Sequence, residues 1–383
     1  MVGDEVATAC LGVLNEGMSL ASTNKTLITL ILKVKSPNRI TDYRPISLCN
    51  VIYKIISKML TNRLRLVMNS IISEEQSAFI PGRLISDNAI IGFECLHVIK
   101  RKRSKKRGYL ALKLDMAKAF DRVEWSFVQG IMTKLGFSEV WIRKIMACET
   151  LVSFSFLING AKFGQLFPTR GLRQGDLLSP YLFLLCAEGL SSLFHHFEAT
   201  DRLQGMRCGW NGPTISHLFF ANDSLLFFEA STDLCLAVKE AFTWYETASG
   251  QLVSYSKSIV CFGPNVAEDH VDQMTTSLGV ARVGCHEKYL GLPCFYSKNK
   301  RRLFASIKDR VWNKLSEWKS KFLSISGREV LTKAIIQSIP TYSMSMFKLP
   351  YSLIKELHRL CAQFWWGRND EKKRMHWCTW DNL

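Results

Sequence analysis

The chain alternates between short apolar runs and longer segments in which apolar residues recur every three or four positions. Residues 26–34 and 109–115 are apolar runs of strand length. Two further runs flank Asn222-Asp223 within residues 216–229, which read SHLFFANDSLLFFE. Because Asn and Asp favour tight turns, this segment is predicted to be a buried β-hairpin with a polar tip.

Helical spacing predicts several amphipathic or buried helices between these strands. The expected helices cover residues 51–72, 86–100, 124–135, 179–197 and 232–249. A second hairpin is expected in residues 151–167, turning at Asn159-Gly160, and residues 171–176 form a polar loop. Strands and helices thus interleave from about residue 27 to residue 262, which predicts an α+β domain.

The C-terminal part of the chain has a different pattern. After Lys298 the sequence becomes helical and basic, and we expect a boundary near residues 289–297. A length of 383 residues is compatible with two or three structural units.

Charge points to a polyanionic partner. The formal net charge is +17, from 50 Lys and Arg against 33 Asp and Glu. Nucleic acid is the first candidate and an anionic membrane surface the second, while a simply soluble basic protein stays open. The run Lys100–Arg107, KRKRSKKR, is a solvated loop, a phosphate-binding loop or a nuclear address.

Cysteine usage and hydropathy indicate the cellular compartment in which we expect the protein. The twelve cysteines include no CxxC pair, so no zinc knuckle or redox motif is predicted. No run approaches the roughly 20 apolar residues of a membrane span. We therefore expect an intracellular, reduced protein without a membrane partner.

Two carboxylates carry the candidate chemistry. Asp115 ends the apolar run 109–115, and Asp223 lies at the tip of the predicted hairpin. Carboxylates brought together from two strand ends can hold two Mg²⁺ ions about 4 Å apart, which serves phosphoryl transfer. Taken alone, however, Asn222-Asp223 is also an ordinary turn.

Eight sequence blocks extend this interpretation. They resemble, in family order and over nearly the whole chain, the reverse transcriptase of plant LINE-type (non-LTR) retrotransposons. The blocks are DYRPISLCNVIYKIISK from Asp42, QSAFIPGRLISDNAI from Gln76, KLDMAKAFDRVEW from Lys113, GLRQGDLLSPYLF from Gly171, HLFFANDSLLF from His217, ASGQLVSYSKS from Ala248, KYLGLP from Lys288 and FWWG from Phe364.

The resemblance implies an α+β right-hand polymerase fold with fingers and palm in residues 14–294. A helical, truncated thumb-like region would occupy residues 295–383, with a primer grip around residues 289–291. The implied activity is RNA-directed DNA polymerisation with two Mg²⁺ ions, or Mn²⁺ in their place. The implied partners are an RNA template, a DNA primer and deoxynucleoside triphosphates. The endonuclease and downstream domains of such polyproteins are expected to be missing.

The resemblance also implies roles for individual residues. Metal ligands would be Asp115, the Met116 carbonyl, Asn222 and Asp223, and Lys257 would protonate leaving pyrophosphate. Substrate contacts would come from Phe120, which would exclude a ribose 2′-hydroxyl, from Gln174 and Gly175 beside the template and incoming base, and from Lys33 and Arg44 beside the triphosphate.

Each of these positions has a plain structural alternative. The alternatives are Phe120 as core, Arg44 paired with Asp42, Gln174-Gly175 as a simple turn, and Asp121 and Glu124 as helix-capping residues.

One position departs from the family pattern. The family's hairpin tip is aromatic-Ala-Asp-Asp, and the first of these aspartates bridges both metals, whereas this chain has Phe220-Ala221-Asn222-Asp223. One unit charge at 4 Å is worth about 4 kcal/mol at an effective dielectric of 20. Two hypotheses follow: a working polymerase, or a catalytically dead remnant that still binds nucleic acid.

Overall fold

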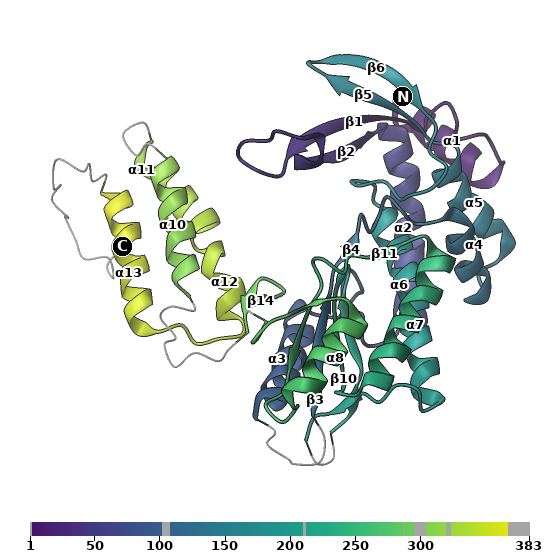
Figure 1. The fold of residues 1–383 in the computed structure, drawn as a ribbon. Coiled ribbons are helices and arrows are strands. Elements are labelled where there is room, and N and C mark those ends of the chain that lie inside the picture. The colour runs from purple at the N-terminus through teal and green to yellow at the C-terminus, as the bar shows by residue number, and fades with distance from the viewer. Residues whose placement is uncertain are drawn as a thin grey trace. The chain divides into compact units, whose positions relative to one another are not determined.

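The computed structural model describes residues 2–101, 108–209, 212–286, 288–294, 304–318 and 323–366. Contacts divide the chain into two compact units, residues 1–286 and 287–383, which are described separately (Figure 1).

A four-stranded sheet forms one end of the first unit. Its strands are β1 (Lys25–Leu32), β2 (Tyr43–Cys49), β5 (Ser153–Ile158) and β6 (Ala161–Leu166), in the order β2-β1-β5-β6. β1 runs antiparallel to β2 and parallel to β5. The first predicted strand and the β5–β6 hairpin are confirmed. Both central residues of that hairpin, Asn159-Gly160, have positive φ angles, as type I′ turns require.

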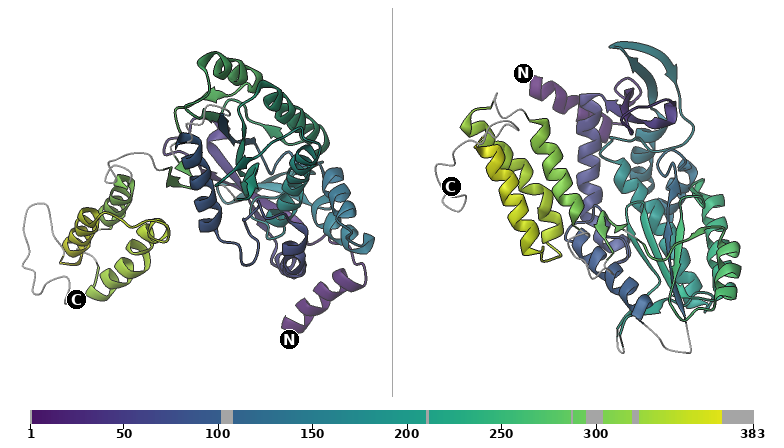
Figure 2. Two further views of the ribbon diagram at one scale, coloured as in Figure 1. Left: turned by 90° about the horizontal axis from the view of Figure 1, so that it is seen from below. Right: turned by 60° about the vertical axis from the view of Figure 1, so that its left-hand side comes forward.

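A five-stranded sheet forms the centre of the first unit. Its strands are β3 (Tyr109–Leu114), β9 (His217–Phe220), β10 (Asp223–Glu229), β12 (Ile259–Phe262) and β13 (Ala281–Arg282), in the order β13-β12-β3-β10-β9. Five consecutive residues of β10 are buried, because helices cover both faces of the sheet. Figures 1 and 2 show α3 on one side of this sheet and α6 and α7 on the other.

Helices supply most of the remaining core. The helices of this unit are α1 (Val2–Asn15), α2 (Val51–Ile71), α3 (Ile85–Arg101), α4 (Trp125–Lys134), α5 (Glu139–Thr150), α6 (Ser179–Ala199), α7 (Thr232–Ser249) and α8 (Glu268–Leu278). All five predicted helices are confirmed. α6 is buried along most of its length and packs with Phe194 and Phe197 against the five-stranded sheet. None of the helices in the described ranges has both the length and the apolar character needed to cross a bilayer.

Three short pairs of strands complete the folded elements. Next to the central sheet, β4 (Met116–Ala117) pairs with β11 (Leu252–Val253). β7 (Met206–Arg207) pairs with β8 (Thr214–Ile215). In the second unit, β14 (Lys288–Tyr289) pairs with β15 (Leu292–Pro293).

The second unit is otherwise helical. Its helices are α10 (Ala305–Glu317), α11 (Ile325–Leu331), a π-helical turn (Thr332–Ile336), α12 (Ser338–Met344) and α13 (Tyr351–Trp365). Their apolar faces enclose a separate core that includes Phe304, Val311 and Phe364.

The division between the units falls after His286, ahead of the expected boundary at 294–295. The β14–β15 hairpin belongs with the helices, and one contact between them is a hydrogen bond from the Tyr342 hydroxyl of α12 to the Leu290 carbonyl at 2.9 Å. The assignment of fingers and palm to residues 14–294, and of a thumb to 295–383, stays a prediction.

Candidate active site

The tip of the β9–β10 hairpin differs by one residue from the expected one. Asp223 is already the first residue of β10 and pairs with Phe220, so the turn consists of Ala221 and Asn222. Ala221, rather than Asn222 or Asp223, has the positive φ angle, 53°. A positive φ at the first central residue is the pattern of a type II′ turn, and it is unusual for a residue with a Cβ.

Gln76 stabilises this turn from outside the hairpin. Its buried side-chain oxygen accepts hydrogen bonds from the amides of Ala221 and Ala78, both at 3.0 Å. The backbone of the same segment pairs with the edge of β9, where the Phe219 amide donates to the Glu75 carbonyl at 2.8 Å. Asn88 of α3 donates to the Phe219 carbonyl at 3.0 Å. The conformation of the tip therefore depends on a segment about 145 positions earlier in the chain.

The two aspartates face each other across neighbouring strands. Ser224 lies opposite Leu114 in the β10–β3 ladder, and the next positions of the two strands are Asp223 and Asp115. Side chains at directly opposed positions lie on one face of a sheet, with Cβ atoms about 5 Å apart. Burial raises the pKa of Asp223, and the nearby Asp115 carboxylate raises it further against the opposing effect of Lys113. This like-charge contact is the environment in which a bound cation is most favourable.

A short segment after β11 surrounds Asp115. The Ser258 hydroxyl accepts from the Asp115 amide at 3.1 Å, and the Asp115 carbonyl accepts from the Ser254 amide at 2.7 Å. Lys257 Nζ lies 4.0 Å from Asp115 Oδ2, with its side chain 73% exposed. The structure thus places the Lys257 ammonium group beside the Asp115 carboxylate.

Met116 and Phe120 lie just beyond Asp115 in the chain. Met116 is in β4 and pairs with Val253 of β11. The half-buried Phe120 ring stacks on Phe183 of α6, with centroids 4.8 Å apart and an interplanar angle of 6°. Phe120 therefore packs against α6 and is partly accessible to solvent.

Gln174 and Gly175 belong to a loop that packs on β2. The Gln174 carbonyl accepts from the Ser47 amide at 2.8 Å, and its side chain donates to Asp121 Oδ1 at 3.0 Å. Gly175 has a φ of +106°, and a Cβ there would lie 3.2 Å from the Ser47 carbonyl oxygen. The loop is therefore more than a simple turn. It borders a cavity of about 240 Å³ lined in part by Pro45, Asp121 and Gln174.

Neither predicted capping residue caps α4. Asp121 binds Gln174, as above, while Glu124 occupies the N-cap position without a side-chain cap and forms an ion pair with Arg170 at 3.1 Å. Both side chains are used to hold the loop before α6 instead.

The same loop is anchored by a buried charged cluster that sequence analysis missed. The expected polar loop has Arg173 and Asp176 almost fully buried, 2.9 Å apart. Tyr53 and Ser57 of α2 each donate to the Asp176 carboxylate at 2.6 Å. Arg173 also donates to Asn24 at 2.6 Å. Charged residues within a polar run give no sequence signal of burial, because several of the groups that cover them, Asn24, Tyr53 and Ser57, are more than 100 positions away.

A second carboxylate in the cluster has an unusual protonation state. Glu149 of α5 is fully buried, and its Oε1 lies 3.7 Å from Arg173 Nη2, beyond hydrogen-bond distance. Burial raises the pKa of Glu149 to about 7, because desolvation outweighs the attraction of Arg173. Burial lowers the pKa of Arg173, but Glu149, Tyr53 and Asp176 more than offset this, so the guanidinium stays charged.

Lys33 and Arg44 lie in the other sheet, away from the aspartates. Lys33 follows β1, and its Nζ donates to the Thr41 carbonyl at 3.0 Å. Arg44 is an exposed residue of β2. Asp42 was suggested as the partner of Arg44, but it has other partners. Its Oδ2 accepts hydrogen bonds from the amides of Asn38 and Arg39, both at 3.0 Å.

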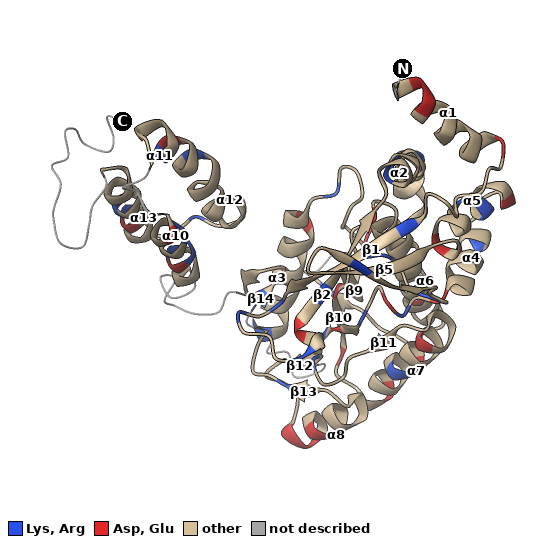
Figure 3. Cartoon of the chain, turned by 90° about the horizontal axis from the view of Figure 1, so that it is seen from above, with Lys and Arg blue, Asp and Glu red and all other residues tan. Residues whose placement is uncertain are grey.

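Basic side chains are spread over many elements. Figure 3 shows Lys and Arg on α2, α5 and the strands of both sheets, while Asp and Glu mark the first turns of α1 and α8. Lys100 and Arg101 end α3, and the rest of the basic run lies outside the described residues.

Comparison with known proteins identifies the family. Residues 31–294 match the family model described as reverse transcriptase (RNA-dependent DNA polymerase). The chain belongs to the reverse transcriptase family, and its α+β right-hand polymerase fold is that of the family.

The relatives include proteins of mobile elements. The chain is 26% identical over 350 residues to the "Transposon TX1 uncharacterized 149 kDa protein" of Xenopus laevis, covering 90% of this chain and 26% of that protein. It is 30% identical over 161 residues, 42% of this chain and 15% of the relative, to the Pol polyprotein of retrotransposable element R2DM of Drosophila melanogaster. An uncharacterized mitochondrial protein of Arabidopsis thaliana is 55% identical over 69 residues, 18% of this chain and 57% of that protein. The domain is thus of the non-LTR retrotransposon type, and it spans about a quarter of the TX1 protein.

Among solved structures, telomerase of Candida tropicalis with a telomeric RNA fragment is similar, with a TM-score of 0.48 and 14% identity. The match covers 90% of this chain and 58% of the telomerase chain.

Reverse transcriptases use divalent metal ions, and the observed donors fit such an ion in part. Asp115 and Asp223 supply two facing carboxylates, half-exposed and half-buried respectively, with a like-charge repulsion that a cation relieves. Asn222, exposed in the turn, supplies an amide oxygen in place of a third charge.

Proposed function

We propose that this chain is the RNA-directed DNA polymerase domain of a plant LINE-type retrotransposon. It extends the 3′-hydroxyl of a DNA primer on an RNA template, using deoxynucleoside triphosphates. The observation that carries the proposal is the opposed placement of Asp115 and Asp223 at neighbouring strand ends of the central sheet. The 55% identity to a plant protein supports the plant origin.

In this proposal Asp115, the Met116 carbonyl, Asp223 and Asn222 hold Mg²⁺, or Mn²⁺ in its place. When bound, the ions activate the attacking hydroxyl and stabilise the pyrophosphate leaving group. Lys257, exposed and 4.0 Å from Asp115, is placed to donate a proton to that leaving group.

The remaining residues select and position the nucleotide. Phe120, which stacks on Phe183, is proposed to exclude a ribose 2′-hydroxyl. Gln174 borders the cavity beside β2 and Gly175 packs against Ser47 of β2, where a template base or the incoming base would pack. Lys33 and Arg44 are proposed to approach the triphosphate from the neighbouring sheet.

Asn222 favours a second candidate function, that of a nucleic-acid-binding domain without polymerase activity. Replacing Asp by Asn keeps the shape of the turn, since Ala221 and Gln76 define its backbone. It removes a charge worth about 4 kcal/mol near a metal, which corresponds to roughly a thousandfold in rate.

Primer extension by the purified chain and its Asn222→Asp variant tests both candidates. We expect the variant to extend an RNA-templated DNA primer up to about a thousandfold faster, and Asp115→Asn to abolish extension. Equal, robust extension by the chain and Asn222→Asp would refute the charge argument. Binding of primer-template by both without any extension would select the second candidate.

A further inference from the structure

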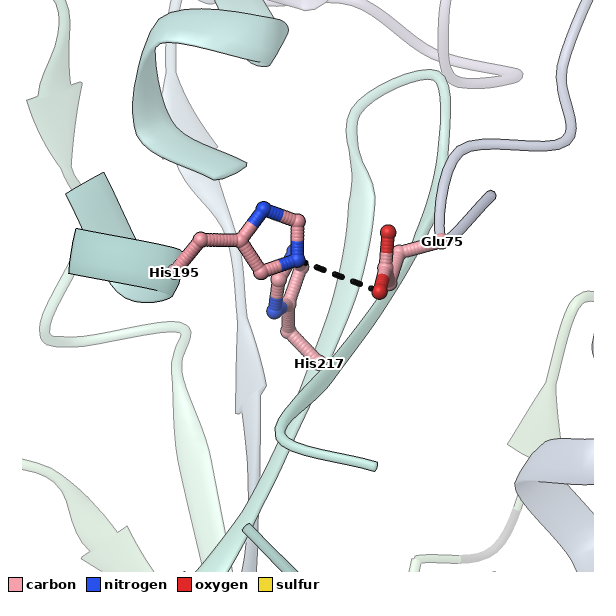
Figure 4. A group of neighbouring side chains, drawn as sticks. All are labelled: Glu75, His195 and His217. Atoms are coloured by element: carbon pink, nitrogen blue, oxygen red, sulfur yellow. Dashed lines mark hydrogen bonds and ion pairs between the residues drawn. The ribbon is translucent and has the colours of Figure 1, made fainter. Parts of the chain in front are cut away.

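A second group of metal-ligating side chains lies apart from the aspartates. Figure 4 shows Glu75, His195 and His217 pointing toward one another. Glu75 immediately precedes Gln76, His195 lies in the last turns of α6, and His217 opens β9. One ligand atom from each of the three residues lies within 4.8 Å of the others.

The spacing is near that of a zinc site. Ligand atoms about 2.0–2.1 Å from a tetrahedral zinc ion are roughly 3.3 Å apart. His195 Nε2 and Glu75 Oε1 are 3.2 Å apart, so this pair already has the required separation. The ligand atoms of the three residues lie within 4.8 Å of one another, so His217 has to approach the pair by about 1.5 Å to complete the set.

The chemistry of the donors favours a transition metal. Two imidazoles and one carboxylate form a set that suits zinc and its neighbours better than Mg²⁺, which prefers oxygen. His217 is fully buried, and its ring would bind a metal in the neutral form. The side chains of His195 and Glu75 are 42% and 29% exposed, which gives an ion access from solvent.

Neighbouring hydroxyl groups orient the ring of His217. Ser191 and Ser216 hydrogen-bond the two ring nitrogens of His217 at 2.7 and 2.9 Å. On metal binding one of these hydrogen bonds is released, and the other fixes the tautomer of the ring. Glu188 accepts from the Ser73 hydroxyl at 2.9 Å, and that hydroxyl lies 2.8 Å from the Ser191 hydroxyl. A further carboxylate is thus connected to His217 through two serine hydroxyls.

We propose that Glu75, His195 and His217 bind one divalent transition-metal ion, with zinc the expected species, and that this ion ties the segment around Gln76 to β9 and α6. The site is structural, and it is separate from the oxygen ligands of the Asp115–Asp223 pair. Because Gln76 holds the Ala221 amide, the bound ion stabilises the segment that supports the hairpin tip. The proposal does not depend on polymerase activity.

Cobalt(II) binding to the untagged, chelator-treated chain tests the proposal. Millimolar Mg²⁺ is present throughout to occupy oxygen-ligand sites. We expect one equivalent of Co²⁺ to bind with visible d–d absorption and without a sulfur-to-cobalt charge-transfer band, and Zn²⁺ to displace it.

Three variants locate the ligands. His195→Ala and Glu75→Gln are expected to weaken Co²⁺ binding at least tenfold, and His195→Ala keeps the fold because the side chain is partly exposed. The matched control is His196→Ala, the exposed neighbouring histidine, which should bind as the parent chain does. Circular dichroism of the metal-free proteins checks that each variant is folded. The absence of Co²⁺ binding, equal binding by His195→Ala, or a sulfur charge-transfer band would each overturn the proposal.

Discussion

The charged cluster around Arg173 combines two carboxylates with one guanidinium in a space that excludes water. Arg173 and Asp176 neutralise each other at 2.9 Å, and this leaves Glu149 without a full counter-charge. Burial in this space, together with the nearby Asp176 carboxylate, outweighs the attraction of Arg173 and raises the pKa of Glu149 to about 7.

This raised pKa makes stability depend on pH. In the unfolded chain Glu149 loses its proton near pH 4.5, whereas in the folded chain it keeps the proton until about pH 7. The folded state therefore binds more protons between these values, and stability decreases as pH rises through this window, by up to about 3 kcal/mol.

Glu149→Gln should remove that dependence, because Gln resembles the protonated acid. We expect the free energy of unfolding to decrease less between pH 5 and 7, and to exceed that of the parent chain at pH 8. Urea unfolding across this range measures both effects. Glu139→Gln, at the exposed start of the same helix, is the control and should keep the parent slope. An unchanged slope in Glu149→Gln would mean that Glu149 is ionised in the folded state.

At the scale of elements, the conformation of the β9–β10 hairpin depends on a segment outside the hairpin. The turn needs a positive φ at Ala221 that its own residue disfavours, and Gln76 supplies the compensating hydrogen bond.

Gln76→Ala should leave the Ala221 and Ala78 amides without their acceptor. We expect a loss of about 1–3 kcal/mol of stability and faster hydrogen exchange at the Ala221 amide. Ser224→Ala, in the same hairpin but away from Gln76, serves as the control for the local effect. Unaltered exchange at Ala221 in the Gln76 variant would show that the turn is stable by itself.

Local sequence signals were sufficient for the longest helices and two hairpins, but α1, α5 and α8 were not predicted, nor were the distant residues that hold these elements in place. Asn159-Gly160 predicted its hairpin because the turn chemistry is contained in two residues, and the α2, α6 and α7 helices followed from periodicity. The tip of the other hairpin was misplaced by one residue, because Ala221 adopts its conformation through a hydrogen bond with Gln76.

The candidate site shows the same limit. The aspartates could be found from strand ends and motif resemblance. The β10–β3 strand pairing then places them opposite each other. The burial of Arg173 and the cluster of Glu75, His195 and His217 could not be found, since each joins residues more than 100 positions apart.

At the scale of the whole molecule, the net charge of +17 dominates encounters with nucleic acid. Each phosphate that a basic side chain neutralises releases condensed counterions, so affinity falls steeply with added salt.

Replacing the basic residues of the run 100–107 by Gln should flatten the salt dependence of primer-template binding. The log–log slope is expected to decrease by about 0.7–0.9 for every phosphate that the variant no longer neutralises. Fluorescence anisotropy between 50 and roughly 200 mM salt measures the slope. The run has seven Lys and Arg, and changing the seven Lys and Arg of α10, α11, the π-helical turn and α13 to Gln gives a charge-matched control. Identical slopes for the parent chain and the run variant would leave the run as a solvated loop.

The buried charged cluster around Arg173 limits which substitutions related sequences can accept. One guanidinium serves Asn24 ahead of β1, Tyr53 in α2 and Asp176 in its own loop. The lysine ammonium is a single point charge and cannot reproduce the several directed donors of a guanidinium. Even the conservative substitution Arg173→Lys would therefore leave one of these partners without a hydrogen bond. In an alignment of related chains these positions should therefore covary as a block, with neutral substitutions appearing at several of them together.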